Sequence, residues 1–191
     1  MDFIKNNIAN IITIARLLLL PLIVALFYLE QNWGAWAAWL CFFTYIIAAT
    51  SDFFDGYVAR KLDQVSAFGT FLDPISDKIF VASMLLLLVG FDRIEGLWII
   101  PVIVIFAREF LVSGLREFLG PKNIIVPVTK LAKWKTTLQM LSTGFLIIGP
   151  YAPYALELGL VLLLLAMIVT VITGMSYMVT GFKHLKDAGQ N

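Results

Sequence analysis

The chain has 191 residues, of which 60% are apolar and 14% are charged, and its mean hydropathy is +0.89. About a quarter of the residues in a typical soluble domain are charged, so this composition excludes that class and indicates a membrane protein. The formal net charge is only +1, and we expect no nucleic-acid partner. The length suits one membrane domain covering residues 1–191. The single cysteine, Cys41, cannot form an intrachain disulfide and is expected to be a small buried apolar residue.

Six long apolar segments predict an all-α integral membrane protein with six transmembrane helices. A short polar segment, residues 1–7, precedes them and is expected to lie at the membrane interface. Gln31-Asn32, Gly90, Gly120-Pro121 and Gly149-Pro150 punctuate the connections. Pro21 predicts a kink in the first span. The predicted spans are Ile8 to Leu29, Trp33 to Arg60, Ala67 to Val89, Leu97 to Phe118, Thr129 to Ile148 and Ala155 to Phe182.

The distribution of basic residues predicts the topology. Lysine and arginine gather at the N-terminus, between the second and third spans, between the fourth and fifth spans, and at the C-terminus, whereas the alternate loops contain only Arg93. Cytoplasmic loops carry the excess of basic residues, so both termini and the connection after the second span are predicted to be cytoplasmic. Aromatic residues near the opposite ends predict an outer aromatic belt: Trp33, Trp36, Trp98, Tyr151 and Tyr154.

Four aspartates lie in the stretch from Ser51 to Lys78 and are flanked on both sides by apolar runs. On a helix, Asp52 and Asp55 share a face with two small residues, and Asp73 shares a face with Asp77. A polar break from Arg60 to Ser66 predicts a turn that brings the two pairs face to face. Each ionised aspartate at membrane depth costs about 2.5–3.5 kcal/mol, so a compensating cation is expected. Hard divalent cations prefer carboxylate oxygens, and a two-metal site suits phosphoryl transfer.

The same residues resemble the signature of the CDP-alcohol phosphatidyltransferase family, whose members are integral membrane proteins with six helices. The pattern is Asp52-x2-Asp55-Gly56-x2-Ala59-Arg60-x8-Gly69-x3-Asp73-x3-Asp77, and every signature position is filled. The resemblance implies that Asp52, Asp55 and Asp73 hold two Mg²⁺ or Mn²⁺ ions. It also implies that Asp77 contributes to the metal site and acts as the catalytic base, and that the chain forms a homodimer. Gly56, Ala59, Arg60 and Gly69 would line the CDP pocket.

Three polar residues, Asn10, Thr13 and Arg16, form a stripe along the first predicted helix. The stripe could be a wall of the aspartate site that contacts the nucleotide or its phosphates. It could equally be a seam of hydrogen bonds between helices. For Asn10 and Thr13 both interpretations stay open, and we place them with the CDP-binding residues. For Arg16 we favour the site wall, because an arginine inside an apolar span needs a partner.

Four basic residues near the fourth and fifth helices form a candidate phosphate-binding group, because arginine can hold a phosphate bidentately. Glu109 could simply pair with one of them, but the basic residues outnumber the acids. Nearby Lys122 and Lys130 are better explained by membrane topology. The four candidates are Arg108, Arg116, Lys133 and Lys135.

The stretches AREFLVSGLREF, from Ala107, and KLAKWKT, from Lys130, resemble the phosphatidylglycerophosphate synthase branch of the family. This implies transfer of the phosphatidyl group from CDP-diacylglycerol to sn-glycerol 3-phosphate, releasing CMP, at the cytoplasmic side of a bacterial inner membrane. One alternative is another acceptor, namely serine, an inositol phosphate or phosphatidylglycerol. An alternative from another class is a divalent-cation transporter. A transporter should place its charges near the midplane, whereas here the acids cluster near one connection.

Overall fold

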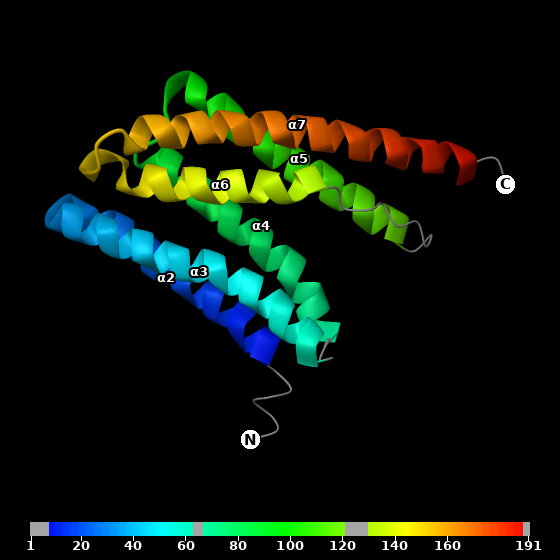
Figure 1. Cartoon of the computed structure of the whole chain (residues 1–191), viewed down its shortest axis with the longest axis horizontal. Helices are drawn as coiled ribbons and strands as arrows, with labels where there is room; N and C mark the ends of the chain where they lie inside the picture. The colour runs from blue at the N-terminus through cyan, green and yellow to red at the C-terminus, as the bar shows by residue number, and fades with distance from the viewer. Residues whose placement is uncertain (1–7, 63–66, 121–129, 189–191) are drawn as a thin grey trace. The chain divides into compact units, whose positions relative to one another are not determined.

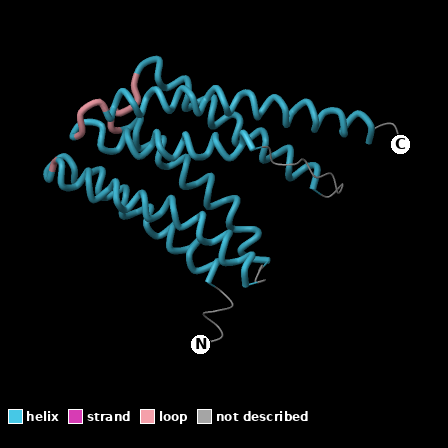
Figure 2. The backbone as a smooth tube through the Cα atoms, viewed as in Figure 1, coloured by secondary structure: helices cyan, strands magenta, loops and turns pink. Residues whose placement is uncertain are grey.

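The computed structural model describes the backbone of residues 8–62, 67–120 and 130–188. Side chains are described throughout these ranges, except those of residues 8–12, 52–62, 67–70, 73, 130, 132 and 180–188. The described residues form helices and connecting loops, with no β-strand among them (Figures 1 and 2). The α-helices are α2 (Ile8–Trp33), α3 (Ala35–Leu62), α4 (Ala67–Gly90), α5 (Ile99–Leu119), α6 (Lys130–Ile148) and α7 (Ala155–Ala188). Two 3-10 turns, η1 (Gly96–Trp98) and η3 (Gly149–Tyr151), precede α5 and α7.

Each predicted apolar segment is a helix, but the connection between the first two is shorter than predicted. Gln31 and Asn32 were expected in a loop and instead lie within α2. A single residue, Gly34, separates α2 from α3 at a φ of +56°. Its N–H donates to the Glu30 carbonyl at 2.8 Å, which closes the last turn of α2. Glycine adopts this left-handed conformation without a steric penalty, so the chain reverses in one residue.

The predicted turn from Arg60 to Ser66 is also shorter than expected. Helix α3 continues through Leu62, and residues 63–66 lie outside the described part of the chain. Helix α2 continues through Pro21, and α4 continues through Pro74. The last helix ends at Ala188, six residues beyond the predicted limit.

Within the described residues, three helical stretches are long and apolar enough to cross a membrane, namely Thr13–Trp33, Gly96–Leu119 and Ala155–Val179. Large apolar side chains lie on the surface, and Trp36 is 85% exposed, while Thr13, Arg16 and Gln139 are buried. A soluble domain shows the opposite distribution, because water favours polar side chains on its surface. The chain is therefore an all-helical membrane protein, and its number of spans stays a prediction.

The chain divides into two compact units. The first contains Met1–Arg93 and Thr143–Leu156, and the second contains Ile94–Ser142 and Glu157–Asn191. In the first unit α2 packs against both α3 and α4, and Figure 1 shows α2 and α3 running side by side. Small residues on one face of α3 allow this close approach. The buried apolar residues of these two helices include Ile23, Leu26 and Phe27 on α2 and Ala37, Ala38, Cys41 and Ala48 on α3.

An ion pair closes the end of the first unit where α2 and α4 finish. The Arg93 guanidinium donates to the carboxylate of Glu30, which is buried. Tyr151, in η3, also hydrogen-bonds to Glu30, and partial burial together with this carboxylate raises the pKa of the phenol. Arg93 is the one basic residue in the loops that are predicted to be extracytoplasmic. It is thus paired with an acid and links the ends of α2 and α4.

In the second unit, α6 and α7 are joined by a hydrogen bond. The Ser142 hydroxyl donates to the Gly159 carbonyl at 2.8 Å, and both groups are buried. Helix α5 is joined to the same unit through a cluster of charged side chains, described below.

Candidate functional site

The four aspartates of the signature lie on the helical segments on either side of residues 63–66. Asp52 and Asp55 occupy the last part of α3, and Asp73 and Asp77 occupy the first part of α4. Residues 63–66 lie outside the described part of the chain, and the face-to-face arrangement of the two pairs stays a prediction. Among these four, only the side chain of Asp77 is described. The side chains at the other predicted positions, Asn10, Asp52, Asp55, Gly56, Ala59, Arg60, Gly69 and Asp73, lie outside the described set.

Asp77 is held by the first described helix. Arg16 on α2 donates through Nη1 to Asp77 Oδ1 at 2.6 Å and through Nη2 to Ser76 Oγ at 3.1 Å. The Arg16 side chain is only 3% exposed, whereas the Asp77 side chain is 49% exposed. Thr13, one turn before Arg16, is fully buried. Arg16, one member of the polar stripe predicted on this helix, therefore faces α4, and this buried arginine has the partner that its position required.

This contact leaves the carboxylate as the accessible member of the pair. A charge-assisted hydrogen bond of 2.6 Å is short and strong, and it fixes one oxygen of Asp77. Half of the Asp77 side chain still faces the surroundings. Asp77 is thus oriented by the protein and open to a ligand, which a metal ligand or a catalytic base both require.

A second charged cluster lies in the other unit and is centred on Glu109 of α5. The Lys135 ammonium on α6 and the Arg108 guanidinium both donate to Glu109 Oε1, the latter at 3.2 Å. Lys135 and Arg108 are 10% and 12% exposed. The alternative that Glu109 pairs with a basic residue is confirmed, and two cations share this carboxylate.

Helix α7 completes the cluster with residues that the sequence had not indicated. Arg116 Nη2 donates to the Tyr177 hydroxyl at 2.9 Å, and Arg108 Nη2 makes a long contact of 3.5 Å with Thr173 Oγ1. The guanidinium carbons of Arg116 and Arg108 lie 5.2 and 5.8 Å from the centre of the Tyr177 ring. These distances are within the range of cation–π attraction.

Thr173 and Tyr177 lie one turn apart on α7, and both are buried within a largely apolar helix. Two polar side chains one turn apart on an apolar helix are the sequence signal from which Thr173 and Tyr177 could have been predicted to face another helix.

Lys133, which was predicted to belong to this group, lies elsewhere. It is two residues before Lys135, so the two side chains leave α6 in nearly opposite directions. Lys133 is exposed, whereas Lys135 is buried against Glu109. The structure therefore brings together Arg108, Arg116 and Lys135 but does not join Lys133 to them.

Positive charge exceeds negative charge in this cluster. Arg108, Arg116 and Lys135 carry three positive charges, and Glu109 carries the only negative charge among these four side chains. In addition, Arg108 Nε is buried and has no hydrogen-bond partner among the described residues. A buried donor without an acceptor is costly, so this arrangement suits an anionic ligand that supplies oxygen acceptors.

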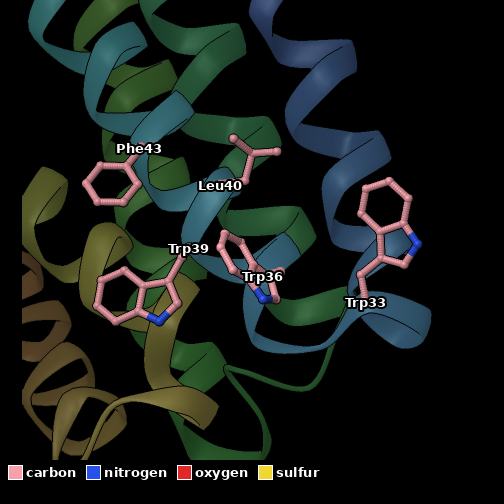
Figure 3. Close-up of a pocket in the computed structure, with 5 residues that line it drawn as sticks. All are labelled: Trp33, Trp36, Trp39, Leu40 and Phe43. Atoms are coloured by element: carbon pink, nitrogen blue, oxygen red, sulfur yellow. The ribbon is translucent and has the colours of Figure 1, made fainter.

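The apolar hollow in Figure 3 has a different character. It has a volume of about 660 Å³ and is lined by Trp33, Trp36, Trp39, Leu40 and Phe43. These side chains offer no acid, base or metal ligand, so the hollow cannot carry the chemistry of the aspartate segment. Trp33 and Trp36 are exposed, as expected for membrane-interface anchors.

Among the side chains that the structure describes, no group of three potential metal ligands occurs. Three of the four signature aspartates lie outside that set, so this observation does not bear on them. The four residues supply only carboxylate oxygens, which is the donor chemistry that Mg²⁺ and Mn²⁺ prefer. With Asp77 half exposed, the donor set fits a divalent cation.

Comparison with known proteins identifies the family. The CDP-alcohol phosphatidyltransferase family profile matches residues 6–173. A protein of Rickettsia prowazekii, named CDP-diacylglycerol–glycerol-3-phosphate 3-phosphatidyltransferase, is 42% identical over 91% of this chain and 94% of its own length. Proteins with the same name from Cereibacter sphaeroides and Escherichia coli are 39% and 34% identical, each over 95% of this chain and 98% of the relative. The chain belongs to the CDP-alcohol phosphatidyltransferase family.

Proposed function

We propose that this enzyme transfers the phosphatidyl group from CDP-diacylglycerol to sn-glycerol 3-phosphate, giving phosphatidylglycerophosphate and CMP. The observation that carries the proposal is the similarity over nearly the whole chain to relatives named for this reaction, at 34–42% identity. The complete aspartate signature supports the chemistry, and the excess of positive charge around Glu109 supports a phosphorylated acceptor.

Asp52, Asp55, Asp73 and Asp77 would hold two Mg²⁺ or Mn²⁺ ions. When bound, these ions would neutralise charge on the diphosphate and on the departing CMP. The preference of hard cations for carboxylate oxygens supports this assignment, and so does the accessible carboxylate of Asp77.

Asp77 is also the proposed general base. In this step the acceptor hydroxyl oxygen attacks the phosphorus that carries the lipid, and the bond between that phosphorus and the CMP oxygen breaks. The hydroxyl proton passes to the Asp77 carboxylate. Arg16 keeps this carboxylate in place through Oδ1, and Ser76 anchors the other arm of the guanidinium.

The nucleotide half of CDP-diacylglycerol would bind along the aspartate helices. Gly56, Ala59 and Gly69 are small and leave space for a ligand close to the backbone. Arg60 would contact a phosphate, and Asn10 and Thr13 on α2 would complete the pocket. The buried position of Thr13, one turn from Arg16, is compatible with either a pocket wall or a helix seam.

Arg108, Arg116 and Lys135 would bind the acceptor phosphate, whereas Lys133, which the sequence grouped with them, lies exposed on another face of α6. Three observations support this assignment. The cations outnumber the acid, Arg108 and Lys135 are largely buried, and Arg108 Nε has no described acceptor. Serine carries no phosphate, so a serine acceptor would leave this charge unexplained.

We further propose a single membrane domain of six spans in a bacterial inner membrane, with both termini and the active site on the cytoplasmic side, that functions as a homodimer. The asymmetry of basic residues between alternate loops supports the orientation. In a Cys41→Ala background, a cysteine at Asp92 should be labelled by an impermeant reagent from outside, and one at Lys61 should not. The opposite pattern would invert the topology.

The function is tested by incubating the purified protein with CDP-diacylglycerol, Mg²⁺ and a panel of acceptors while CMP release is measured. We expect rapid release with glycerol 3-phosphate and little with glycerol or serine. Efficient use of serine instead of glycerol 3-phosphate would refute the acceptor while leaving the family chemistry intact.

A further inference from the structure

Helix α7 makes an unusually close approach to Arg108 at Gly174. A Cβ atom at this position would lie 2.9 Å from Arg108 Cγ and 3.6 Å from Arg108 Nε. Real Cβ contacts are essentially never shorter than 3.0 Å. The far end of a flexible side chain could move away from an added methyl group at little cost. Cγ lies near the base of the Arg108 side chain, so a methyl group at position 174 would displace the whole guanidinium.

Two neighbours of Gly174 on α7, Thr173 and Tyr177, contact the arginines directly. Thr173 meets Arg108 Nη2, and Tyr177 accepts a hydrogen bond from Arg116 while its ring faces both guanidinium groups. All three α7 residues are buried. One face of α7 therefore defines the path of Arg108 by its shape and the orientation of Arg116 by a hydrogen bond.

We infer that Thr173, Gly174 and Tyr177 are positioning residues that determine the preference for a phosphorylated acceptor, by holding Arg108 and Arg116 where a phosphate can be gripped. The inference rests on the proposed function. Bidentate recognition of phosphate requires a guanidinium in a defined orientation, and a displaced arginine keeps its charge but loses this geometry. The α7 face thus affects acceptor binding without touching the acceptor.

Gly174→Ala tests the inference without changing any charge. We expect the KM for glycerol 3-phosphate to rise roughly 10-fold or more, which corresponds to the loss of one charge-assisted contact, while the KM for CDP-diacylglycerol changes less than about 3-fold. Gly114→Ala is the matched control. Gly114 is also a helical glycine of the second unit, but its added Cβ would meet nothing within 4 Å.

Tyr177 supplies a second, independent pair of variants. Tyr177→Phe keeps the aromatic ring that faces both arginines and removes the hydroxyl that accepts from Arg116. Tyr177→Leu removes both. We expect a rise of about 2- to 5-fold in the KM for glycerol 3-phosphate for the first, and a larger rise for the second. If Gly174→Ala fails to fold, this graded pair decides the question.

A readout besides activity is the melting temperature of the detergent-solubilised protein with and without glycerol 3-phosphate, since a ligand stabilises the state that it binds. Glycerol 3-phosphate should raise the melting temperature of the parent and of Gly114→Ala, and should raise that of Gly174→Ala much less. A uniform rise in both KM values, with the ligand-induced shift retained, would mean that α7 serves packing alone and would overturn the inference. Failure of the parent to use glycerol 3-phosphate would refute the proposed function itself.

Discussion

The two compact units each hold an arginine within apolar helices, but they balance its charge differently. In the first unit, Arg16 is buried and its described ionic partner, Asp77, is half exposed. In the second unit, the acid is the shared member, because Glu109 accepts from both Arg108 and Lys135. Arg16 thus holds a carboxylate that is itself accessible. The cations around Glu109 outnumber that acid, and under the proposed function their remaining charge would serve an anionic ligand.

The comparison separates two roles for the same residue type. Arg16 would act on catalysis through the orientation of Asp77, so its substitution should lower kcat. Arg108 would act on acceptor binding, so its substitution should raise one KM.

The largest effect is expected at the aspartates. Asp77→Asn should lower kcat by at least ~100-fold, because an amide cannot accept the proton or offset a dication. Asp→Asn at Asp52, Asp55 and Asp73 should be similarly severe. CMP release measures the effect, and size-exclusion chromatography verifies that each variant is folded. Asp92→Asn is the control, since Asp92 is an exposed loop residue at a φ of 57° that asparagine also adopts readily. Ordinary activity in two of the four site variants would refute the metal assignment.

Arg108→Lys should raise the KM for glycerol 3-phosphate by roughly 10- to 150-fold, the equivalent of about 1.5–3 kcal/mol for one charge-assisted contact. The change keeps the charge and removes the planar fork, so the KM for CDP-diacylglycerol should change much less. Steady-state kinetics with each substrate varied in turn measures the difference. Equal impairment toward both substrates would reassign Arg108 to the support of Glu109 and the fold.

Arg16→Lys should have the complementary effect. A lysine ammonium cannot contact Asp77 and Ser76 in the manner of the two guanidinium nitrogens, which lie 2.6 and 3.1 Å from their acceptors. We expect kcat to fall by roughly 10-fold with both KM values nearly unchanged. Ser76→Ala, which removes only the second contact, should cost less. A selective rise in the KM for CDP-diacylglycerol would instead make Arg16 a nucleotide contact.

Much of the fold was predictable, because apolar length and glycine or proline punctuation reflect local physics. The errors fall where local polarity misleads. Gln31 and Asn32 look like a loop, yet a helix tolerates them when Gly34 alone can reverse the chain. Likewise, Arg60 and Lys61 are polar enough to suggest a turn but remain in α3, which ends at Leu62.

The site was predictable in its residue types and less so in its pairings. The burial of Arg16 requires a partner, but the sequence does not identify Asp77, which lies 61 residues away. Tyr177 escaped notice because one buried tyrosine on an apolar helix is ordinary. Gly174 could not be singled out at all, since its importance depends on the path of the Arg108 side chain.

The smallest effect distinguishes the two lysines of α6, which the sequence had grouped together. Lys135→Met should raise the KM for glycerol 3-phosphate several-fold and lower the melting temperature, because Glu109 keeps Arg108 but loses one charge-assisted hydrogen bond, worth about 1.5–3 kcal/mol. Lys133→Met should leave both quantities nearly unchanged, since an exposed charge contributes about 0–1 kcal/mol. The contrast follows from their opposite directions on one helix, with Lys135 buried against Glu109 and Lys133 exposed. Kinetics and thermal melts of the two variants, prepared in parallel, check it. Equal increases in the KM for glycerol 3-phosphate would show that the phosphate-binding group extends to both faces of α6 and that the described cluster is only part of it.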